Sequence, residues 1–254
     1  MPPVAAYMTS VVEIARPDTR LREVLRRLEQ GKISALPIVD GTGELVGVVS
    51  RFDLVRHQRH HPRALDDVCA DVMTRQPITT GVGASLAAAA RAMVQHRIHR
   101  VLVVDGGRLA GVLTTSDLTR AVDDARLAHH LDTIMSSPVA TVRTDQRLGL
   151  AMEWLDRAHI SGLVVTEDDW PVGVFAQEDA LAARHLPPEA ELAALYDPSL
   201  VCLPRDTPLH QAAGLCVRMG VRRVVVSHQR DYVGIVTGLD FAGAIARSDQ
   251  RLAS

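Results

Sequence analysis

The chain has 254 residues, enough for one large or two ordinary domains with their own cores. Apolar residues make up 47% of it and charged residues 23%, but aromatic residues only 3%, so Val, Ile, Leu and Ala must form the core. The 28 basic and 30 acidic residues give a formal net charge of -2, which excludes a global attraction to nucleic acid or to an anionic membrane.

Cysteines and apolar runs indicate a cytoplasmic location. Cys69, Cys202 and Cys216 are isolated and lack CxxC spacing, so neither a disulfide framework nor a zinc site is expected. No apolar run reaches the roughly 18 residues that a membrane helix needs. The start MPPVAAYMTS lacks a signal-peptide pattern. We therefore expect a cytoplasmic protein that contacts no membrane.

One order of predicted elements recurs along the chain. Each copy begins with a Met-Thr-like start and a short strand: YMTSVVEI, VMTRQPITT, IMSSPVATV and LYDPSLVCL. An apolar stripe at helical spacing follows, opening at Leu21, Leu86, Leu148 and Leu209. Thr207-Pro208 predicts that the last of these helices has a hydroxyl cap, with proline in its first position. A β-branched run and a turn then predict the second strand of each copy: LPIVD, VLVVD, LVVT and VVVS.

The third strand of each copy runs into a second helix through a regular motif. The four motifs are GVVSRFDL (47–54), GVLTTSDL (111–118), GVFAQEDA (173–180) and GIVTGLDF (234–241). The fold class is therefore α/β (α+β), with four tandem β-α-β-β-α repeats. Their predicted bounds are 5–58, 68–125, 131–185 and 192–248. Because one such repeat is too small to bury its sheet and helices alone, we expect the repeats to be paired into two two-domain modules.

This four-fold pattern resembles tandem CBS domains, named after cystathionine β-synthase, over roughly residues 5–250. It is similar in organisation to the γ-subunit of AMP-activated protein kinase. The resemblance implies clefts between paired domains that hold adenosine-containing ligands. It assigns the ribose hydroxyls to the motif aspartates: Asp53, Asp117, Asp240 and Asp179. It assigns ribose or phosphate contacts to the motif hydroxyl residues: Ser50, Thr114 and Thr237. Ala176 replaces this hydroxyl residue in the third repeat, which weakens a site there.

Basic pairs precede the middle strand in alternate repeats. His99-Arg100 and Arg222-Arg223 occupy columns that hold Ser34-Ala35 and Ser161-Gly162 in the other two repeats. Their spacing resembles a phosphate-binding pair of the kinase γ-subunit. We expect His99 and Arg100 to face a phosphate, with Asp53 or Asp117 on the ribose. Arg222 and Arg223 are expected to do the same beside Asp240. The alternative is that these residues form solvated strand ends or salt bridges between repeats.

Three groups of residues have ordinary structural explanations. Val48, Val112 and Ile235 flank the motif glycines and are candidates for an adenine pocket, although such positions usually belong to strand cores. The Ser/Thr-x-x-Asp pattern also matches a capping box, which needs no ligand. Histidines in the segments between repeats, among them His57, His60, His61 and His129-His130, are expected to be solvated and to bind no metal.

These observations predict a non-catalytic regulatory protein that binds AMP, ADP, ATP or S-adenosylmethionine, with or without Mg²⁺, and has no resident cofactor or metal. No P-loop, nucleophile elbow or HExxH motif is present, and the repeats leave no room for an enzyme domain. Expected partners are a second copy of the chain or an unknown regulated protein. We expect no binding to nucleic acid. The alternatives are a ligand-free scaffold or dimerisation protein whose motifs only cap helices, and an enzyme that uses Asp and His in one cleft.

Overall fold

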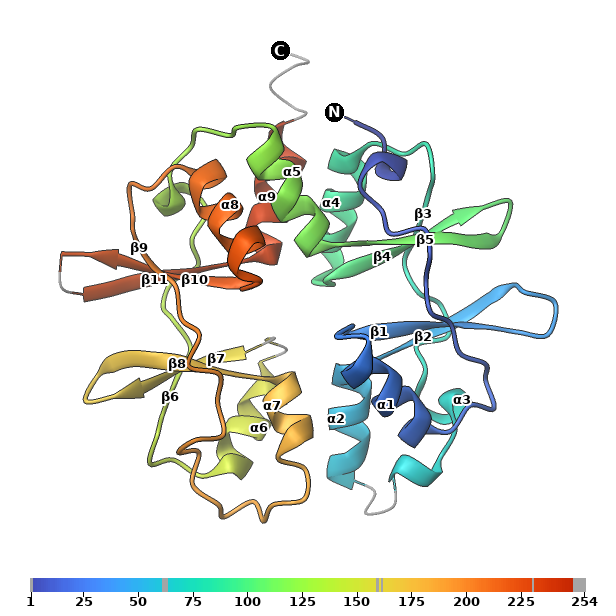
Figure 1. The fold of residues 1–254 in the computed structure, drawn as a ribbon, viewed down its shortest axis with the longest axis horizontal. Helices are drawn as coiled ribbons and strands as arrows, with labels where there is room; N and C mark the ends of the chain where they lie inside the picture. The colour runs from blue at the N-terminus through green and yellow to red at the C-terminus, as the bar shows by residue number, and fades with distance from the viewer. Residues whose placement is uncertain (1, 61–63, 159, 161, 230, 249–254) are drawn as a thin grey trace. The chain divides into compact units, whose positions relative to one another are not determined.

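The computed structural model describes residues 2–60, 64–158, 160, 162–229 and 231–248. These residues form two compact units, and the chain passes repeatedly from one to the other (Figure 1). The even unit, named after repeats 2 and 4, contains residues 2–12, 78–139 and the described residues from 200 onward. The odd unit, named after repeats 1 and 3, contains the described residues of 13–77 and 140–199.

Repeat 2 shows the architecture that the sequence predicts. Its elements are β3 (Thr79–Gly81), α4 (Leu86–His96), β4 (Arg100–Asp105), β5 (Arg108–Thr114) and α5 (Thr115–Asp124). Strand β4 lies in the middle of a three-stranded sheet, parallel to β3 and antiparallel to β5. The β4–β5 hairpin places Arg100 opposite Thr114, so the basic pair of this repeat lies beside its motif.

Repeats 3 and 4 have the same order of elements and the same sheet topology. Repeat 3 consists of β6 (Thr141–Arg143), α6 (Leu148–Arg157), β7 (Gly162–Glu167), β8 (Trp170–Ala176) and α7 (Gln177–Ala182). Repeat 4 consists of β9 (Cys202–Pro204), α8 (Leu209–Met219), β10 (Arg223–His228), β11 (Asp231–Thr237) and α9 (Gly238–Ser248). The expected α/β (α+β) fold class and the order strand, helix, strand, strand, helix are thus confirmed in repeats 2, 3 and 4.

Repeat 1 differs in its first strand. It contains α1 (Leu21–Gln30), β1 (Ala35–Val39), β2 (Leu45–Ser50) and α2 (Arg51–His60), and its first strand is reduced to a bridge between Ala15 and Ile38. In repeat 2 the middle strand donates the Leu102 N–H to the Ile78 carbonyl, at 3.2 Å. Pro37 occupies the equivalent position of β1 and has no N–H to donate. The proline therefore explains the shortened pairing.

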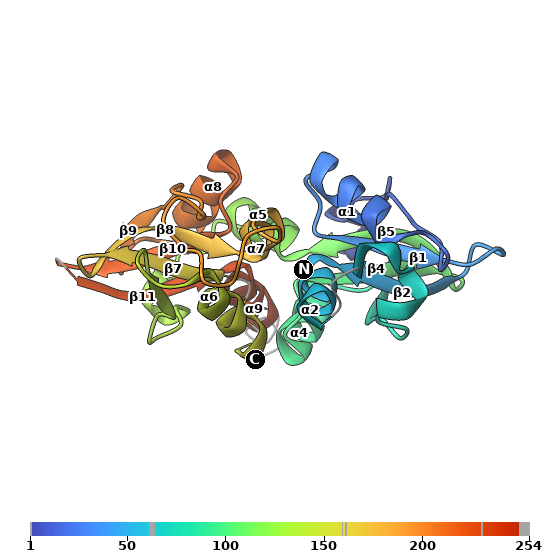
Figure 2. The same ribbon diagram turned by 90° about the horizontal axis from the view of Figure 1, so that it is seen from below.

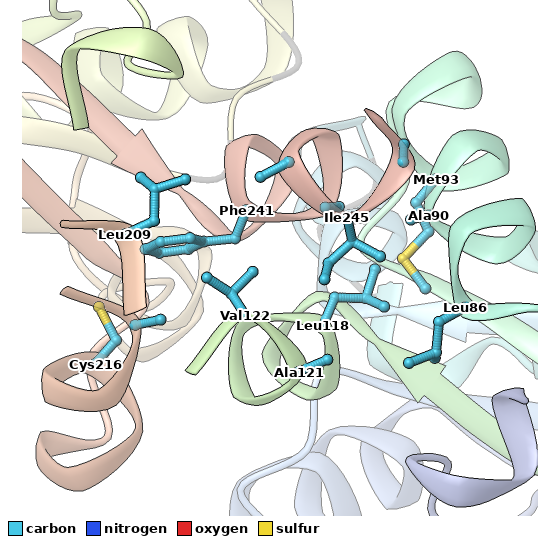
Figure 3. Close-up of a cluster of buried hydrophobic side chains, with 14 of the residues drawn as sticks. Leu86, Ala90, Met93, Leu118, Ala121, Val122, Leu209, Cys216, Phe241 and Ile245 are labelled. Atoms are coloured by element: carbon cyan, nitrogen blue, oxygen red, sulfur yellow. The ribbon is translucent and has the colours of Figure 1, made fainter. Parts of the chain in front are cut away.

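The helices of each unit pack against one another, and the hairpins of a unit point to opposite sides (Figures 1 and 2). In the even unit, α4 packs against α9, and α5 packs against α8 and α9. Figure 3 shows Leu118 and Val122 of α5 facing Phe241 and Ile245 of α9. In the odd unit, α2 packs against α7. Aliphatic residues dominate both cores, as the low aromatic content predicts.

The predicted cap of α8 is wrong. Pro208 itself occupies the N-cap position and no side chain caps the helix there. The first N–H groups of α8 are instead satisfied by the segment before repeat 3: Leu209 donates to the His129 carbonyl at 2.7 Å, and His210 donates to the Leu127 carbonyl at 3.1 Å. Backbone carbonyls therefore replace the hydroxyl cap that the sequence suggested.

Short helical turns occupy the remaining segments: η1 (Val4–Ala6), η2 (Ala64–Asp66), α3 (Cys69–Val72) and η3 (Leu131–Thr133). His57 was predicted to be solvated, but it is half-buried and lies 2.7 Å from the Asp67 carboxylate. His61 and Ser161 lie outside the described residues. Within the described part of the chain, no helix has the length and hydrophobicity to cross a membrane.

Candidate ligand-binding site

The Met-Thr-like starts pair with neighbouring repeats. We call them the lead segments: residues 7–10, 72–75, 134–137 and 195–198. Thr9, at the start of repeat 1, exchanges two backbone hydrogen bonds of 2.9 Å with Val112 of repeat 2. Thr74, at the start of repeat 2, bonds in the same way to Val48 of repeat 1, at 3.0 and 3.1 Å. Repeats 1 and 2 therefore exchange their lead segments.

Repeats 3 and 4 are connected by the same exchange. Ser136, at the start of repeat 3, pairs with Ile235 of repeat 4 through bonds of 2.9 and 3.0 Å. Asp197, at the start of repeat 4, pairs with Val174 of repeat 3 through bonds of 2.8 and 2.9 Å. The three adenine candidates, Val48, Val112 and Ile235, are thus the strand residues to which lead segments bind, and they are half-buried. The adenine assignment itself stays a prediction.

The motif glycines give the lead segments room to pack. A Cβ atom on Gly111 would lie 2.9 Å from the Met8 sulfur and 2.7 Å from the Thr9 carbonyl oxygen. In repeat 3 the segment brings a larger side chain, and a Cβ on Gly173 would lie 2.3 Å from the Tyr196 ring. The glycine of the motif is therefore needed for close packing, and repeat 3 differs from the other repeats in both Ala176 and its bound segment.

The motif aspartates cap the second helix of each repeat. Asp117 accepts the Thr114 N–H at 2.9 Å and the Thr114 hydroxyl at 2.7 Å, both on Oδ2. The Ser50–Asp53 and Thr237–Asp240 pairs have the same geometry. Asp179 receives the Ala176 N–H at 2.7 Å and has no hydroxyl donor at this position. The capping function is thus confirmed, and it occupies one oxygen of each carboxylate.

The other oxygen has different partners in the two repeats of the even unit. Oδ1 of Asp240 accepts the Ser136 hydroxyl at 3.1 Å, from the lead segment bound to repeat 4. Oδ1 of Asp117 accepts a bond of 3.3 Å from the guanidinium of Arg120 on the same helix. The sequence analysis missed both residues. The signal for Ser136 was its place in a Met-Thr-like start. The signal for Arg120 was its position three residues after Asp117 on the same predicted helix.

The two basic pairs come together in the even unit. Burial, and after it the charges of Arg100, Arg223 and Arg222, lowers the pKa of His99 to about 4. The charges of Arg222 and Arg223 reach His99, and the close contact between Gly238 and Thr115 brings the ends of the two motifs together, so the pair from repeat 4 lies near the pair from repeat 2. The β10–β11 register also places Arg223 opposite Thr237 of its motif. We call His99, Arg100, Arg222 and Arg223 the basic cluster.

Two helix N-termini meet beside the basic cluster. The first residues of α5 and α9 are Thr115 and Gly238, and a Cβ on Gly238 would lie 2.5 Å from the Thr115 hydroxyl oxygen. Thr115 also donates its N–H to the His99 carbonyl at 2.9 Å. Helix N-termini carry partial positive charge and favour anions. The helix ends and the basic cluster therefore create a positive potential in the same place.

The equivalent place in the odd unit contains an ion pair. Arg51, the first residue of α2, lies 3.1 Å from Glu178 of α7, and its side chain is only 11% exposed. Arg51 also donates to the Leu28 carbonyl at 3.1 Å. The columns of the basic pairs hold Ser34, Ala35 and Gly162 among the described residues of this unit. An acidic side chain thus balances the charge here, in contrast to the even unit.

Metal-binding groups are not gathered in the described part of the chain. No three His, Cys, Asp or Glu side chains lie close enough there to hold a metal ion. The chemistry of the even-unit site is therefore that of arginine side chains, one imidazole, helix N-termini and two capped carboxylates.

Comparison with known proteins identifies the family. The family model of the CBS domain matches residues 4–60, 69–124, 131–186 and 192–247. The chain belongs to the CBS-domain family. CBS domains in tandem are typically regulatory modules, and the recognition made from the repeated motif is confirmed.

One structural match over nearly the whole chain is to protein MJ1225 from Methanocaldococcus jannaschii, described as a candidate archaeal homologue of the γ-subunit of AMP-activated protein kinase. The TM-score is 0.85, with 18% sequence identity over 96% of this chain and 100% of that one, and it shows a shared fold. A Thermofilum pendens protein from a ribosomal RNA operon is 30% identical over 63% of this chain and 57% of its own. Inosine-5'-monophosphate dehydrogenase from Mycobacterium tuberculosis is 36% identical over 41% of this chain, which covers 19% of the enzyme. The chain thus spans little more than half of one of these curated relatives and a fifth of the other.

Proposed function

We propose that this CBS-domain protein is a non-catalytic cytoplasmic regulator that binds a phosphorylated adenosine nucleotide at its even unit. The phosphates bind to the basic cluster, and the ribose binds to Asp240 or Asp117. The observation that carries the proposal is the convergence of basic pairs from two repeats beside two helix N-termini. Arginine and backbone N–H groups at helix ends are the groups that proteins use for phosphate.

The charge of the basic cluster also favours one class of adenosyl ligand. AMP, ADP and ATP, the last with Mg²⁺, are anions that the cluster attracts, whereas S-adenosylmethionine carries a sulfonium cation near its ribose. Ribose hydroxyls can donate to a carboxylate oxygen. Val112 and Ile235, half-buried next to the bound lead segments, are the proposed adenine contacts. Ribose binding by Asp53 or Asp179, with Val48 beside the first, stays a prediction for the odd unit.

Calorimetry with AMP, ATP and S-adenosylmethionine tests this proposal. We expect the double substitution Arg222→Ala and Arg223→Ala to weaken ATP binding by about 100-fold or more, since each hydrogen bond to a charged group contributes about 1.5–3 kcal/mol. The control is Arg143→Ala, which removes an exposed arginine paired with Asp145. Equal ATP affinity in the wild type and the double variant contradicts the phosphate assignment.

A second candidate function is a ligand-free scaffold. The complete capping bonds of the motif aspartates favour it, because they explain the motif without a ligand. It predicts no thermal shift with any nucleotide. A ligand present at 100 times its dissociation constant adds about 2.7 kcal/mol to the free energy of unfolding. A thermal melt with and without ATP therefore distinguishes the scaffold from the regulator, and pull-down against a second copy or a regulated protein then finds its partner.

A further inference from the structure

The two motif aspartates of the even unit differ in what holds their second oxygen. Ser136, a neutral hydroxyl, donates to Asp240, whereas the charged Arg120 donates to Asp117. The position three residues after the aspartate, occupied by Arg120 in repeat 2, holds Gly243 in repeat 4. Repeat 4 therefore lacks the side chain that binds the carboxylate of repeat 2.

Arg120 also binds the N-terminal segment, residues 2–12. Its guanidinium donates to the Tyr7 carbonyl at 3.0 Å and lies over the Tyr7 ring, 5.4 Å from the centroid. The Tyr7 hydroxyl donates to Asp124 at 2.9 Å. Burial and this hydrogen bond raise the pKa of Tyr7, so its hydroxyl stays protonated as a donor. Arg120 and Asp124 lie four residues apart on α5, and together they hold Tyr7.

The N-terminal segment lies over the motif of repeat 2. Thr9 pairs with Val112 in both directions, and the space that Gly111 leaves accommodates Met8. One arginine thus connects the candidate ribose carboxylate to a segment that begins more than a hundred residues earlier in the chain. Oδ2 of Asp117 already accepts two hydrogen bonds, so a ligand hydroxyl is left with Oδ1, the oxygen that Arg120 binds through a charge-assisted bond.

We propose that Arg120 is a specificity-determining residue that makes the repeat 2 site weaker than the repeat 4 site and couples its occupancy to the N-terminal segment. The inference rests on the proposed function. In this proposal a ribose hydroxyl that binds Oδ1 of Asp117 takes the place of Arg120 instead of sharing the oxygen with it, and the bonds of Arg120 to Tyr7 are then lost as well. Because coupling between binding and a conformational equilibrium is reciprocal, a change that frees the N-terminal segment also raises affinity at Asp117.

The first test measures affinity for AMP and ATP in an Asp240→Asn background, which keeps a cap acceptor but removes the charge of the repeat 4 site. We expect Arg120→Ala to bind about two- to fivefold more tightly than its parent, the range expected for loss of a half-exposed ion pair. The control is Arg157→Ala, which removes a comparable ion pair with Glu153 on α6 of the odd unit. Unchanged or weaker binding by Arg120→Ala overturns the inference.

The second test measures hydrogen exchange of the Thr9 amide and its neighbours in the otherwise wild-type chain. Saturating AMP is expected to accelerate exchange in residues 2–12, and Arg120→Ala is expected to give the faster exchange already without AMP. If exchange in this segment responds neither to AMP nor to Arg120→Ala, the inference is overturned while the proposed function stands. If no nucleotide binds to any of these proteins, the proposed function fails, and this inference fails with it.

Discussion

The even and odd units are built from the same repeat, yet they differ in the charged residues at the N-termini of their second helices. In the even unit, small residues, Thr115 and Gly238, stand where two helix N-termini meet, and the basic cluster lies beside them. In the odd unit the equivalent place contains Arg51 with its own counter-ion, Glu178. A duplicated fold can thus keep its helices and caps while one unit gathers positive charge at this place and the other contains an ion pair there.

The largest expected effect concerns His99. Its pKa in the folded protein is about 4, below the ordinary value of 6.5, so the unfolded chain takes up a proton between these values and the folded chain does not. Because protonation favours the unfolded chain, the free energy of unfolding decreases as the pH falls through this window, by up to about 3 kcal/mol. Chemical denaturation at pH 7, 6, 5 and 4 measures it.

A His99→Gln variant supplies the control for this pH series, since it cannot titrate. As the pH decreases from 6.5 to 4, the free energy of unfolding is expected to fall more for the wild type than for the variant. A difference that stays constant over this range contradicts the burial of His99 beside the arginine charges.

The next effect is expected in the odd unit. Glu178→Ala removes the counter-ion of Arg51, whose side chain is 11% exposed, whereas Glu178 itself is 46% exposed. Because solvent reaches the glutamate, we expect a loss of about 2 kcal/mol, less than for a fully buried pair. Urea denaturation measures it. Arg51→Met together with Glu178→Ala should restore part of the stability, and a further loss in this double variant contradicts the explanation.

The smallest effect on stability separates capping from binding. Asp240→Ala and Asp179→Ala each remove a helix cap, which costs about 1 kcal/mol. We expect similar decreases in thermal stability, but a loss of ATP affinity only for Asp240→Ala, because the basic cluster lies in the even unit. If both variants bind ATP like the wild type, Asp240 and Asp179 only cap helices.

Much of the fold could be predicted from the sequence because its signals are local. Apolar stripes that open at Leu86 or Leu209 indicate a helix within a dozen residues, and Gly with Asp at fixed spacing indicates the turn into the next helix. Repeat 1 was the exception, since Pro37 removes a single donor whose importance is visible only once the parallel strand is known.

The candidate site was only partly predictable. The sequence pointed to His99 and Arg222 separately, but their proximity depends on how α5 packs against α8 and α9, which no local pattern encodes. The same holds for the bond between Ser136 and Asp240, which are 104 residues apart. The sequence shows which residues carry charge. Which of them lie close together depends on long-range packing.

Because the lead segments are exchanged, a single repeat cannot be cut out of this protein intact. A cut between repeats 1 and 2 separates Thr9 from Val112 and Thr74 from Val48, so each fragment keeps a strand edge that its neighbour was meant to cover. A single repeat is therefore not a self-contained building block of the chain.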